Sequence, residues 1–193
     1  MPDFYIIGTG FVADLYMKSF GAYPDIQIAG AFDKNPDRLA AFSAHWSVPS
    51  LNSLEALFAA AKPGDIVLNL TNPDAHYEVS CDVLDAGMNV YSEKPLAMNM
   101  EHAHDLAARA KAAGLEITSA PCSGLSETAQ TLWAAVRNKT AGEARLIYAE
   151  MDDDFIPQAP YKKWLSESGA PWPYVDEFEV GCTVEHAGYY LCW

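Results

Sequence analysis

The sequence predicts an α/β fold: a doubly wound parallel sheet, followed by an incomplete α/β domain with an open sheet. Short β-like runs alternate with longer helical patterns through the first 120 residues, a glycine-rich turn follows the first run, and the pattern changes after residue 121. Alternation of this kind is typical of parallel strands joined by crossover helices. We therefore expect a first domain over residues 1–120 and a second domain over residues 121–193.

The elements of the first domain follow from the spacing of apolar residues and from proline and glycine signals at their ends. The expected strands are residues 4–7, 26–32, 66–70, 89–91 and 115–118. The expected helices between them are residues 12–20, 36–43, 54–61, 74–86 and 100–113. Pro36 stands where a helix can begin, and Gly87 and Gly114 stand where the last two helices end.

The second domain has a different composition. Residues 126–137 predict a helix and residues 145–150 a strand, and a segment rich in proline and aromatic residues then runs through Tyr174. Residues 185–193 predict the first turns of another helix. Because one strand cannot form a sheet by itself, we expect this domain to be incomplete, with the chain stopping inside it and apolar surface left exposed.

Charge and composition exclude several classes of partner. The chain has 12 basic and 26 acidic residues and a net charge of −14, which repels nucleic-acid phosphates and anionic membranes. No apolar run approaches the ~20 residues that span a bilayer, and the first strand leaves no room for a signal peptide. The 4 cysteines lie far apart without a CxxC pair, as expected for reduced thiols. We expect a cytoplasmic protein with no nucleic-acid or membrane partner and no metal site.

The turn after the first strand has the pattern of a phosphate-binding loop. Gly8 permits a tight turn, Gly10 lets the backbone approach a diphosphate, and Ala13 is small enough for close packing of helix on strand. The amide groups and the dipole at the start of the next helix favour phosphates. We interpret this context as a dinucleotide-binding Rossmann domain, with a simple βα turn as the alternative. The predicted phosphate-binding residues are Gly8, Thr9, Gly10, Phe11, Val12 and Ala13.

Asp33, at the end of the second expected strand, is the candidate ligand of the adenosine ribose. It lies near the ~20-residue spacing past the glycines at which an acidic residue accepts hydrogen bonds from the ribose hydroxyls. Such a carboxylate repels a 2′-phosphate, so we favour NAD(H) over NADP(H) as the cofactor. Lys34 and Arg38 weaken this preference because a neighbouring cation can receive the phosphate. The structural alternative for Asp33 is a solvated acidic residue in a loop.

Three later stretches carry a resemblance to a known family. They read NLTNPDAH over residues 69–76, AGMNVYSEKPLA over residues 86–97 and GCTVEHAGYYL over residues 181–191. In this order, and after the glycine turn, they resemble the glucose–fructose oxidoreductase and inositol dehydrogenase family (Gfo/Idh/MocA). The resemblance implies an N-terminal Rossmann domain and a C-terminal domain with an open sheet that often serves for oligomerisation, with the active site between them. A full-length protein would accordingly be a homo-oligomer.

The resemblance also assigns roles to individual residues. It implies that Lys94 binds the substrate hydroxyl and helps to move its proton, while Glu93 and Pro95 shape the nicotinamide pocket. It implies that His186 acts as general base when an alcohol is oxidised. Independently, Lys94 follows a strand at the carboxyl edge, where ligands bind in open parallel sheets, and desolvation there would lower its pKa. A surface lysine and a buried core histidine are the structural alternatives. The loop implied to pass beside the cofactor contains Thr71, Asn72, Pro73 and His76.

The sequence departs from the family at two positions around this histidine. The common pattern has aspartates where this chain has Cys182 and Tyr189, which puts the acid–base relay in question. Cysteine is a weak donor without charge at its ordinary pKa, so we assign it no nucleophilic role. Both residues stay candidates for contact with substrate, together with Lys94 and His186. Glu179 or Glu185 would be a substitute for the missing carboxylate.

Other features allow two readings each. The aromatic segment over residues 155–174 would stack on a sugar ring or pack the two domains together. The acidic run 152–154 would bind a cation, although a solvated loop is the favoured interpretation. His102 and His104 are two residues apart on a helix and point to different faces, so they make a poor metal pair.

These observations favour an NAD(P)-dependent dehydrogenase or reductase acting on a secondary hydroxyl or carbonyl of a sugar, cyclitol or sugar derivative. Hydride transfer needs a partner for the hydroxyl proton, while the cofactor carries the redox step. Two alternatives are open. One is a catalytically silent, NAD-binding regulatory protein, which the missing aspartate favours. The other is an NAD-dependent glycosidase or eliminase, in which transient oxidation activates a carbon–hydrogen bond.

Overall fold

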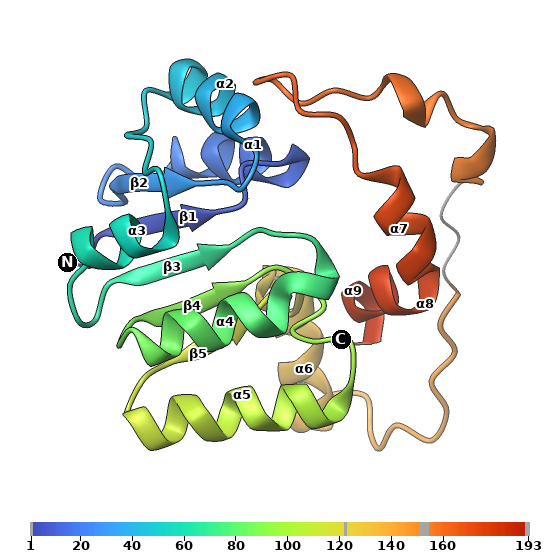
Figure 1. Cartoon of the computed structure of the whole chain (residues 1–193). Helices are drawn as coiled ribbons and strands as arrows, with labels where there is room; N and C mark the ends of the chain where they lie inside the picture. The colour runs from blue at the N-terminus through green and yellow to red at the C-terminus, as the bar shows by residue number, and fades with distance from the viewer. Residues whose placement is uncertain (1, 122, 151–154, 192–193) are drawn as a thin grey trace.

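The computed structural model describes residues 2–121, 123–150 and 155–191 of the chain. Within these ranges the backbone forms one five-stranded parallel sheet with the order β2-β1-β3-β4-β5 (Figure 1). The order reverses beside β1, and such a switch point opens a crevice at the carboxyl ends of the strands. The strands are β1 (Phe4–Ile7), β2 (Ile28–Phe32), β3 (Ile66–Asn69), β4 (Asn89–Ser92) and β5 (Ile117–Ser119).

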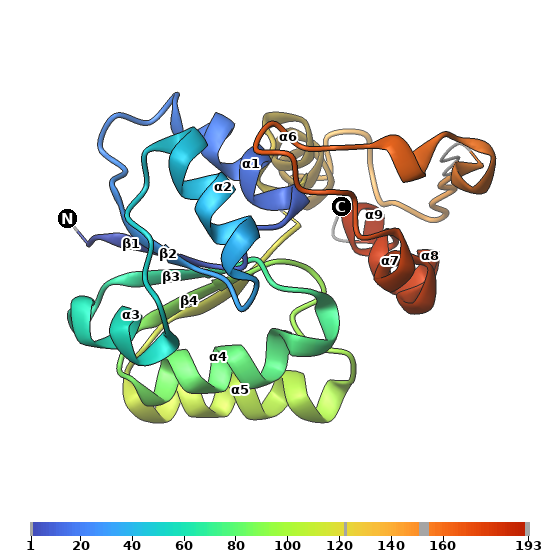
Figure 2. The ribbon, with the colours of Figure 1, turned by 45° about the horizontal axis from the view of Figure 1, so that its top comes forward.

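Helices cover the sheet on both faces, which confirms the predicted doubly wound architecture. Figure 2 shows α1 and α2 on one side of the strands and α3, α4 and α5 on the other. These helices are α1 (Phe11–Phe20), α2 (Pro36–Trp46), α3 (Leu54–Ala60), α4 (His76–Asp85) and α5 (Met100–Ala113). A short 3₁₀ turn, η1 (Pro73–Ala75), leads into α4.

Local signals in the sequence set the helix boundaries. Asn35 caps α2 by accepting hydrogen bonds from two backbone amides of its first turn, and Pro36 occupies the first helical position. Asn99 caps α5 by accepting a hydrogen bond from the His102 amide, and Gly114 ends α5 in the left-handed region with φ 69°. The observed bounds of α5 therefore agree with the predicted ones.

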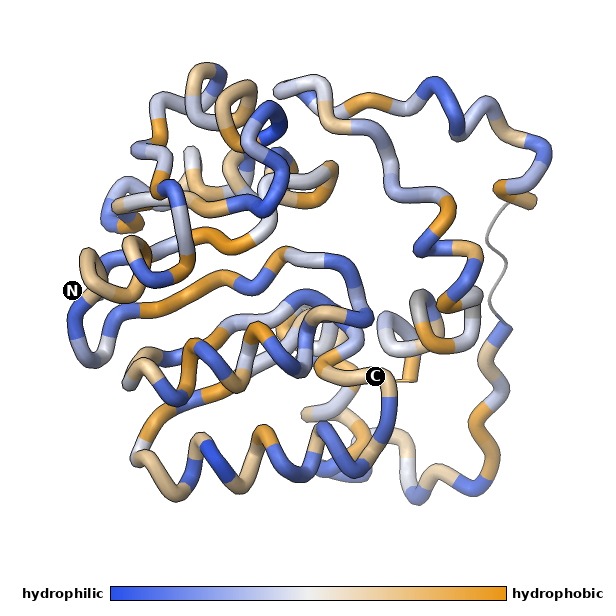
Figure 3. The backbone as a smooth tube through the Cα atoms, viewed as in Figure 1, coloured by the Kyte–Doolittle hydropathy of each residue, from blue (hydrophilic) through white to orange (hydrophobic). Residues whose placement is uncertain are grey.

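The core is divided between the two faces of the sheet. Along β1, Ile6 packs with α1 and α2, whereas Tyr5 and Ile7 pack toward α3, α4 and α5. This alternation is the two-residue period of a strand, and burial on both faces requires every position of β1 to be apolar. Figure 3 shows hydrophobic residues along β1 and β3 in the middle of the sheet. Full burial of each such side chain contributes about 1.5–3 kcal/mol to the free energy of unfolding.

The C-terminal segment is mostly irregular and returns to the sheet at its end. After α6 (Glu127–Arg137) the chain runs as a long arm and comes back at the carboxyl ends of the strands (Figure 1). The returning part contains α7 (Tyr174–Val180), α8 (Cys182–Glu185) and α9 (Gly188–Leu191). The short 3₁₀ turn η2 (Ser123–Leu125) precedes α6, and η3 (Ile156–Gln158) and η4 (Tyr161–Lys163) lie between α6 and α7.

Two predictions for this segment are wrong. Residues 145–150 are not a strand, and Leu146, Ile147 and Tyr148 are 82–87% exposed. A strand needs a neighbour for its backbone groups, and no strand within the described ranges lies beside this one. The single helix expected from residue 185 is instead split into α8 and α9 by a turn at residues 186–187. Gly188 adjoins that turn, and glycine disfavours a continuous helix by about 1 kcal/mol relative to alanine.

The described part of the chain has an apolar surface but no membrane-spanning helix. A mostly apolar groove of about 790 Å³ lies on the α1 face of the sheet, beside β3, β4 and β5. Several large apolar side chains elsewhere are exposed, as expected from the sequence, among them Leu125 and Leu191. Among the described helices, none has the length and apolar character needed to cross a bilayer.

Candidate functional site

A cavity of about 340 Å³ lies at the carboxyl ends of the central strands. One wall is formed by the loops after β1, β3 and β4, and the other wall by the C-terminal segment. The strand-side residues are Gly10, Phe11, Val12, Leu15, Arg38, Leu70, Thr71, Asn72, Pro73, Glu93 and Lys94. The residues from the C-terminal segment are Ile156, Trp164, Pro171, Trp172, Pro173, Asp176, Glu177, His186 and Tyr189.

The glycine turn has the backbone geometry of a phosphate-binding loop. Gly8 has φ 94°, and a Cβ there would lie 2.6 Å from the carbonyl oxygen of Leu70, so no larger residue fits. Gly10 is the N-cap of α1 without a side-chain cap, and a Cβ there would meet nothing within 4 Å. Ala13, in the first turn of α1, is fully buried. The first turn of α1 therefore offers its amide groups to an open cavity, an arrangement that fits a diphosphate.

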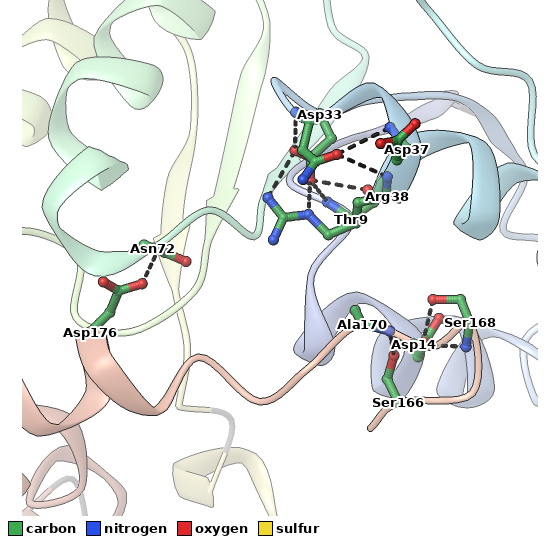
Figure 4. A network of polar contacts seen from close by, with 11 residues as sticks. Thr9, Asp14, Asp33, Asp37, Arg38, Asn72, Ser166, Ser168, Ala170 and Asp176 are labelled. Carbon is green, nitrogen blue, oxygen red and sulfur yellow. Dashed lines mark hydrogen bonds and ion pairs between the residues drawn. The ribbon is translucent and has the colours of Figure 1, made fainter. Parts of the chain in front are cut away.

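Asp33 is buried and bonded to the protein rather than open to the cavity. Its Oδ2 accepts hydrogen bonds from the Thr9 amide at 2.8 Å and from the Thr9 hydroxyl at 3.0 Å. Arg38 donates from Nε to Oδ2 and from a terminal nitrogen to Oδ1, both at 3.0 Å, and the Asn35 amide also reaches Oδ1 at 2.8 Å (Figure 4). Burial alone would raise the pKa of Asp33, but these donors outweigh it and hold the pKa below its usual value.

The cavity is consequently lined by a cation of this pair and not by the carboxylate. Arg38 lines the cavity, whereas Asp33 lies behind it with 6% of its surface exposed. Lys34 is exposed on the surface and is not part of the cavity wall. The sequence predicts all three as cofactor-binding residues. In the structure the guanidinium of Arg38 is the group of this set that faces the cavity.

The buried side chain of His76 contacts the loop after β3 and the loop after β4. The predicted residues Thr71, Asn72 and Pro73 line the cavity. His76 does not line it and is fully buried, with Nδ1 2.6 Å from the carbonyl oxygen of Pro95 and Nε2 2.9 Å from that of Thr71. Carbonyl oxygens only accept, so a ring nitrogen that carries hydrogen donates to the carbonyl beside it. His76 thus joins two strand-end loops of the cavity.

Lys94 is held at the cavity by its neighbour Glu93. Glu93 accepts a hydrogen bond from the Tyr16 hydroxyl at 2.7 Å and another from the backbone amide of Lys94 at 2.9 Å. Desolvation lowers the pKa of Lys94, opposed by the carboxylates of Glu177 and Glu93. The Lys94 ammonium lies 5.6 Å from the centroid of the Tyr189 ring. The lowered pKa that the sequence predicts for this lysine is therefore found.

Three groups from the C-terminal segment face Lys94 across the cavity. His186 and Tyr189 line it as predicted, with ring centroids 6.3 Å apart. Glu177 also lines it, and sequence reasoning missed this residue. Burial raises the pKa of Glu177, opposed by the charges of Lys94 and His186. The proposed substitute Glu179 is exposed. The side chains of the other two candidates lie outside the described part, namely Cys182 and Glu185.

The segment before α7 is fastened to α1 by the buried carboxylate of Asp14. Asp14 is 1% exposed and accepts a hydrogen bond from Trp46 Nε1 at 2.5 Å. It also accepts from the Ser168 amide at 2.9 Å and from the Ser168 hydroxyl at 2.8 Å (Figure 4). Lys18 adds an ion pair to Glu167 at 2.7 Å. These contacts join sequence positions about 150 residues apart. They attach the part of the C-terminal segment just before α7 to α1, and this segment forms the second cavity wall.

The aromatic residues of this segment pack on one another and also face the cavity. Trp164 and Trp172 have ring centroids 5.1 Å apart, and both line the cavity. Tyr161 packs against Phe178 of α7 with centroids 5.1 Å apart. These ring contacts lie within the C-terminal segment, so stacking on a sugar ring and packing of the two domains both stay predictions. The acidic run 152–154, read as a solvated loop, lies outside the described residues.

The fold and the cavity define a nucleotide-binding α/β protein with its site at the switch point of the sheet. The sequence model described as "Oxidoreductase family, NAD-binding Rossmann fold" (GFO_IDH_MocA) matches residues 3–120. The chain belongs to this family, as its motifs had indicated.

Individual relatives cover more of the chain but extend well beyond it. A scyllo-inositol 2-dehydrogenase (NADP(+)) of Bacillus subtilis is 29% identical over 62% of this chain and 37% of that protein. A UDP-N-acetylglucosamine 3-dehydrogenase of Acidithiobacillus ferrooxidans is 27% identical over 80% of this chain and 46% of that protein. The chain thus spans less than half the length of these curated relatives.

Solved structures agree with this assignment. An NAD-binding protein from Listeria innocua is 25% identical with a TM-score of 0.64, covering 74% of this chain and 42% of that chain. The WlbA dehydrogenase from Bordetella pertussis, solved with NADH and UDP-GlcNAcA, is 22% identical with a TM-score of 0.66 over 72% of this chain and 41% of that chain. The second likeness supports the fold alone.

Proposed function

We propose that this chain forms the coenzyme site and part of the substrate site of an NAD(P)-dependent dehydrogenase or reductase. The substrate would be a secondary hydroxyl or carbonyl of a sugar, cyclitol or sugar derivative. One observation carries the proposal: Lys94 and His186, from opposite walls, line the same cavity as the uncapped glycine turn. We further propose that residues 1–120 are the coenzyme domain and that residues 121–193 begin the substrate domain.

The coenzyme would lie along the strand ends with its diphosphate on the first turn of α1. Amides after Gly10 would donate to the phosphates, and Arg38 would lie beside the adenosine ribose. Because Asp33 already pairs with Arg38, the guanidinium would attract a 2′-phosphate only weakly, and we propose NAD(H) as the preferred coenzyme with NADP(H) accepted. When bound, the nicotinamide would supply the hydride chemistry.

Lys94 and His186 would handle the proton at the substrate oxygen. The Lys94 ammonium would donate a hydrogen bond to the hydroxyl or carbonyl oxygen and stabilise negative charge that develops there. His186 would accept the hydroxyl proton in the oxidative direction, a role suited to an imidazole near neutral pH. The two tryptophans and the prolines of the other wall would exclude water from this end.

The first test is a titration of the purified chain with NADH, followed by nicotinamide fluorescence. We expect saturable binding that is lost in Gly10→Glu, because a carboxylate would enter the phosphate position. Lys34→Glu, which adds negative charge on the surface outside the cavity, is the control and should bind within about twofold of the wild type. Absence of saturable binding by the wild-type chain would contradict the proposal.

Turnover is the second test, with NAD⁺ and a panel of polyols, sugars and sugar nucleotides. Reduction of NAD⁺ by any panel member that is lost in Lys94→Met supports the dehydrogenase. Product formation without net change in coenzyme absorbance would favour the glycosidase or eliminase chemistry instead. Saturable NADH binding without any conversion would favour the regulatory alternative, for which the cysteine at position 182 is the motivating feature.

A further inference from the structure

Glu177 differs from the other carboxylates of the cavity in having its oxygens open. Glu93 accepts from the Tyr16 hydroxyl and from the Lys94 amide, so both of its oxygens are occupied. Asp176 accepts a hydrogen bond from the Asn72 side chain. Within the described ranges, no donor hydrogen-bonds the carboxylate of Glu177, although it lines the cavity and is half-buried. The oxygens of such a carboxylate can accept hydrogen bonds from a ligand in the cavity.

The backbone that carries Glu177 is fixed on several sides. Glu177 lies in α7, whose first turn is joined to the loop after β3 by the hydrogen bond between Asn72 and Asp176 (Figure 4). The next residue, Phe178, packs on Tyr161 and Trp172 with ring centroids 5.1 and 5.9 Å away. The position of Glu177 is therefore set by contacts that do not involve its own carboxylate. A side chain that binds a ligand needs such support from its neighbours.

The charges around Glu177 explain how it could be tolerated there and what it would bind. The opposite charges that act on it are Lys94 and His186, the two groups proposed to act on the substrate oxygen, while Glu93 and Asp176 act on it as like charges. Desolvation raises the pKa of Glu177. Its carboxylate has therefore lost water ligands on burial, and the protein does not replace all of them with hydrogen-bond donors. A substrate group that donates hydrogen bonds would supply that replacement.

We propose that Glu177 contacts the substrate and selects a ring that bears a hydroxyl or ammonium group beside the reacting carbon. The inference rests on the proposed function and adds a substrate class to it. The Glu177 carboxylate would accept from that hydroxyl or ammonium group while Lys94 donates to the oxygen on the reacting carbon. Trp164 and Trp172 provide flat apolar surfaces for the ring. A carboxylate or phosphate at the same ring position would face Glu177 and be repelled, so neutral polyols and amino sugars are favoured over sugar acids.

The test compares Glu177→Gln with Glu179→Gln in the same chain. The second variant removes the same charge from an exposed residue of the same helix, and it is the matched control. NADH affinity is measured first for the wild type and both variants. With NADH saturating, the probes glucosamine, myo-inositol and glucuronate are then titrated by the change in nicotinamide fluorescence.

We expect the wild type to bind glucosamine and myo-inositol more tightly than glucuronate. Glu177→Gln should weaken glucosamine by about tenfold or more, as expected for loss of a charge-assisted hydrogen bond, and should tighten glucuronate. NADH affinity should stay within about twofold in both variants. A merely structural role for Glu177 would weaken every probe equally and would not reverse the order of preference.

The two levels of failure are separable. Wild-type chain that does not bind NADH refutes the proposed function. Chain that binds NADH but gives the same probe preference in the wild type, Glu177→Gln and Glu179→Gln overturns only the role of Glu177. A wild type that binds glucuronate more tightly than glucosamine overturns it as well, because the carboxylate would then face the wrong charge.

Discussion

Replacing Asp14 by alanine should loosen the segment that carries the second cavity wall. Asp14 is buried and accepts three hydrogen bonds, one from Trp46 and two from Ser168. A hydrogen bond to a charged acceptor contributes about 1.5–3 kcal/mol, but such contributions within one network do not add fully. The Trp46 and Ser168 donors regain water only in part. We therefore expect the free energy of unfolding to fall by about 3 kcal/mol.

Urea denaturation measures this loss, and a double-mutant cycle assigns it. Ser168→Ala removes the hydroxyl bond alone and should cost about 1 kcal/mol. The double variant should be no less stable than Asp14→Ala, because that bond is already absent. Asp37→Ala is the control: Asp37 is an exposed first-turn residue of α2 and should cost a few tenths of a kcal/mol. Strictly additive losses for Asp14 and Ser168 would refute the reasoning.

The same carboxylate has a signature in pH. Burial opposes its charge, but the donors from Trp46 and Ser168 outweigh burial and lower the pKa of Asp14 below its ordinary value. A carboxyl with a depressed folded-state pKa stabilises the fold above its unfolded pKa, and this contribution is lost as pH falls through the folded pKa. The difference in stability between the wild type and Asp14→Ala should consequently be constant near neutral pH and shrink below about pH 4. A difference that grows in acid would contradict the assignment.

Three further variants test the coenzyme end and the reacting end. Gly8→Ala should abolish NADH binding and destabilise the fold by more than about 1 kcal/mol, because Gly8 has a positive φ and no space for Cβ; unchanged urea unfolding would contradict this. Arg38→Ala should weaken NADPH about tenfold and NADH by less than threefold in fluorescence titrations, because the Asp33 carboxylate loses its cation and would then repel a 2′-phosphate; equal losses for both coenzymes would contradict this reasoning. Lys94→Met should keep NADH affinity within about threefold and eliminate turnover. Since desolvation lowers the Lys94 pKa, wild-type activity should fall at alkaline pH earlier than an ordinary lysine titrates, and a flat profile to pH 10.5 would contradict this.

The elements of the sheet were predictable because their signals are local. Apolar runs, proline at a first helical position and glycine after the last one identify strands and helices within a few residues of where they occur. Gly114 at the end of α5 and Gly8 in the phosphate loop adopt the positive φ that their positions require. Lys94 and His186 were identified from motifs, and the structure places both in the lining of one cavity.

The remaining features depend on contacts that sequence patterns do not contain. Residues 145–150 have the composition of a strand, but pairing decides whether one forms. The pairing of Asp33 with Arg38 turns a predicted ribose ligand away from the cavity, although both residues were identified. Glu177 was missed for two reasons. The helix that carries it, α7, begins after Pro173 without a side-chain cap, so no local signal marks its start. Glu177 also comes near Lys94 only because the C-terminal segment returns to the sheet, which a sequence pattern does not show.

A crystal structure of the chain with NADH is the most direct test of the central claim. We predict the diphosphate against the amides that follow Gly10 and the nicotinamide ring between Lys94 and His186. Coenzyme bound elsewhere, or with its nicotinamide directed away from Lys94, would contradict the proposed site.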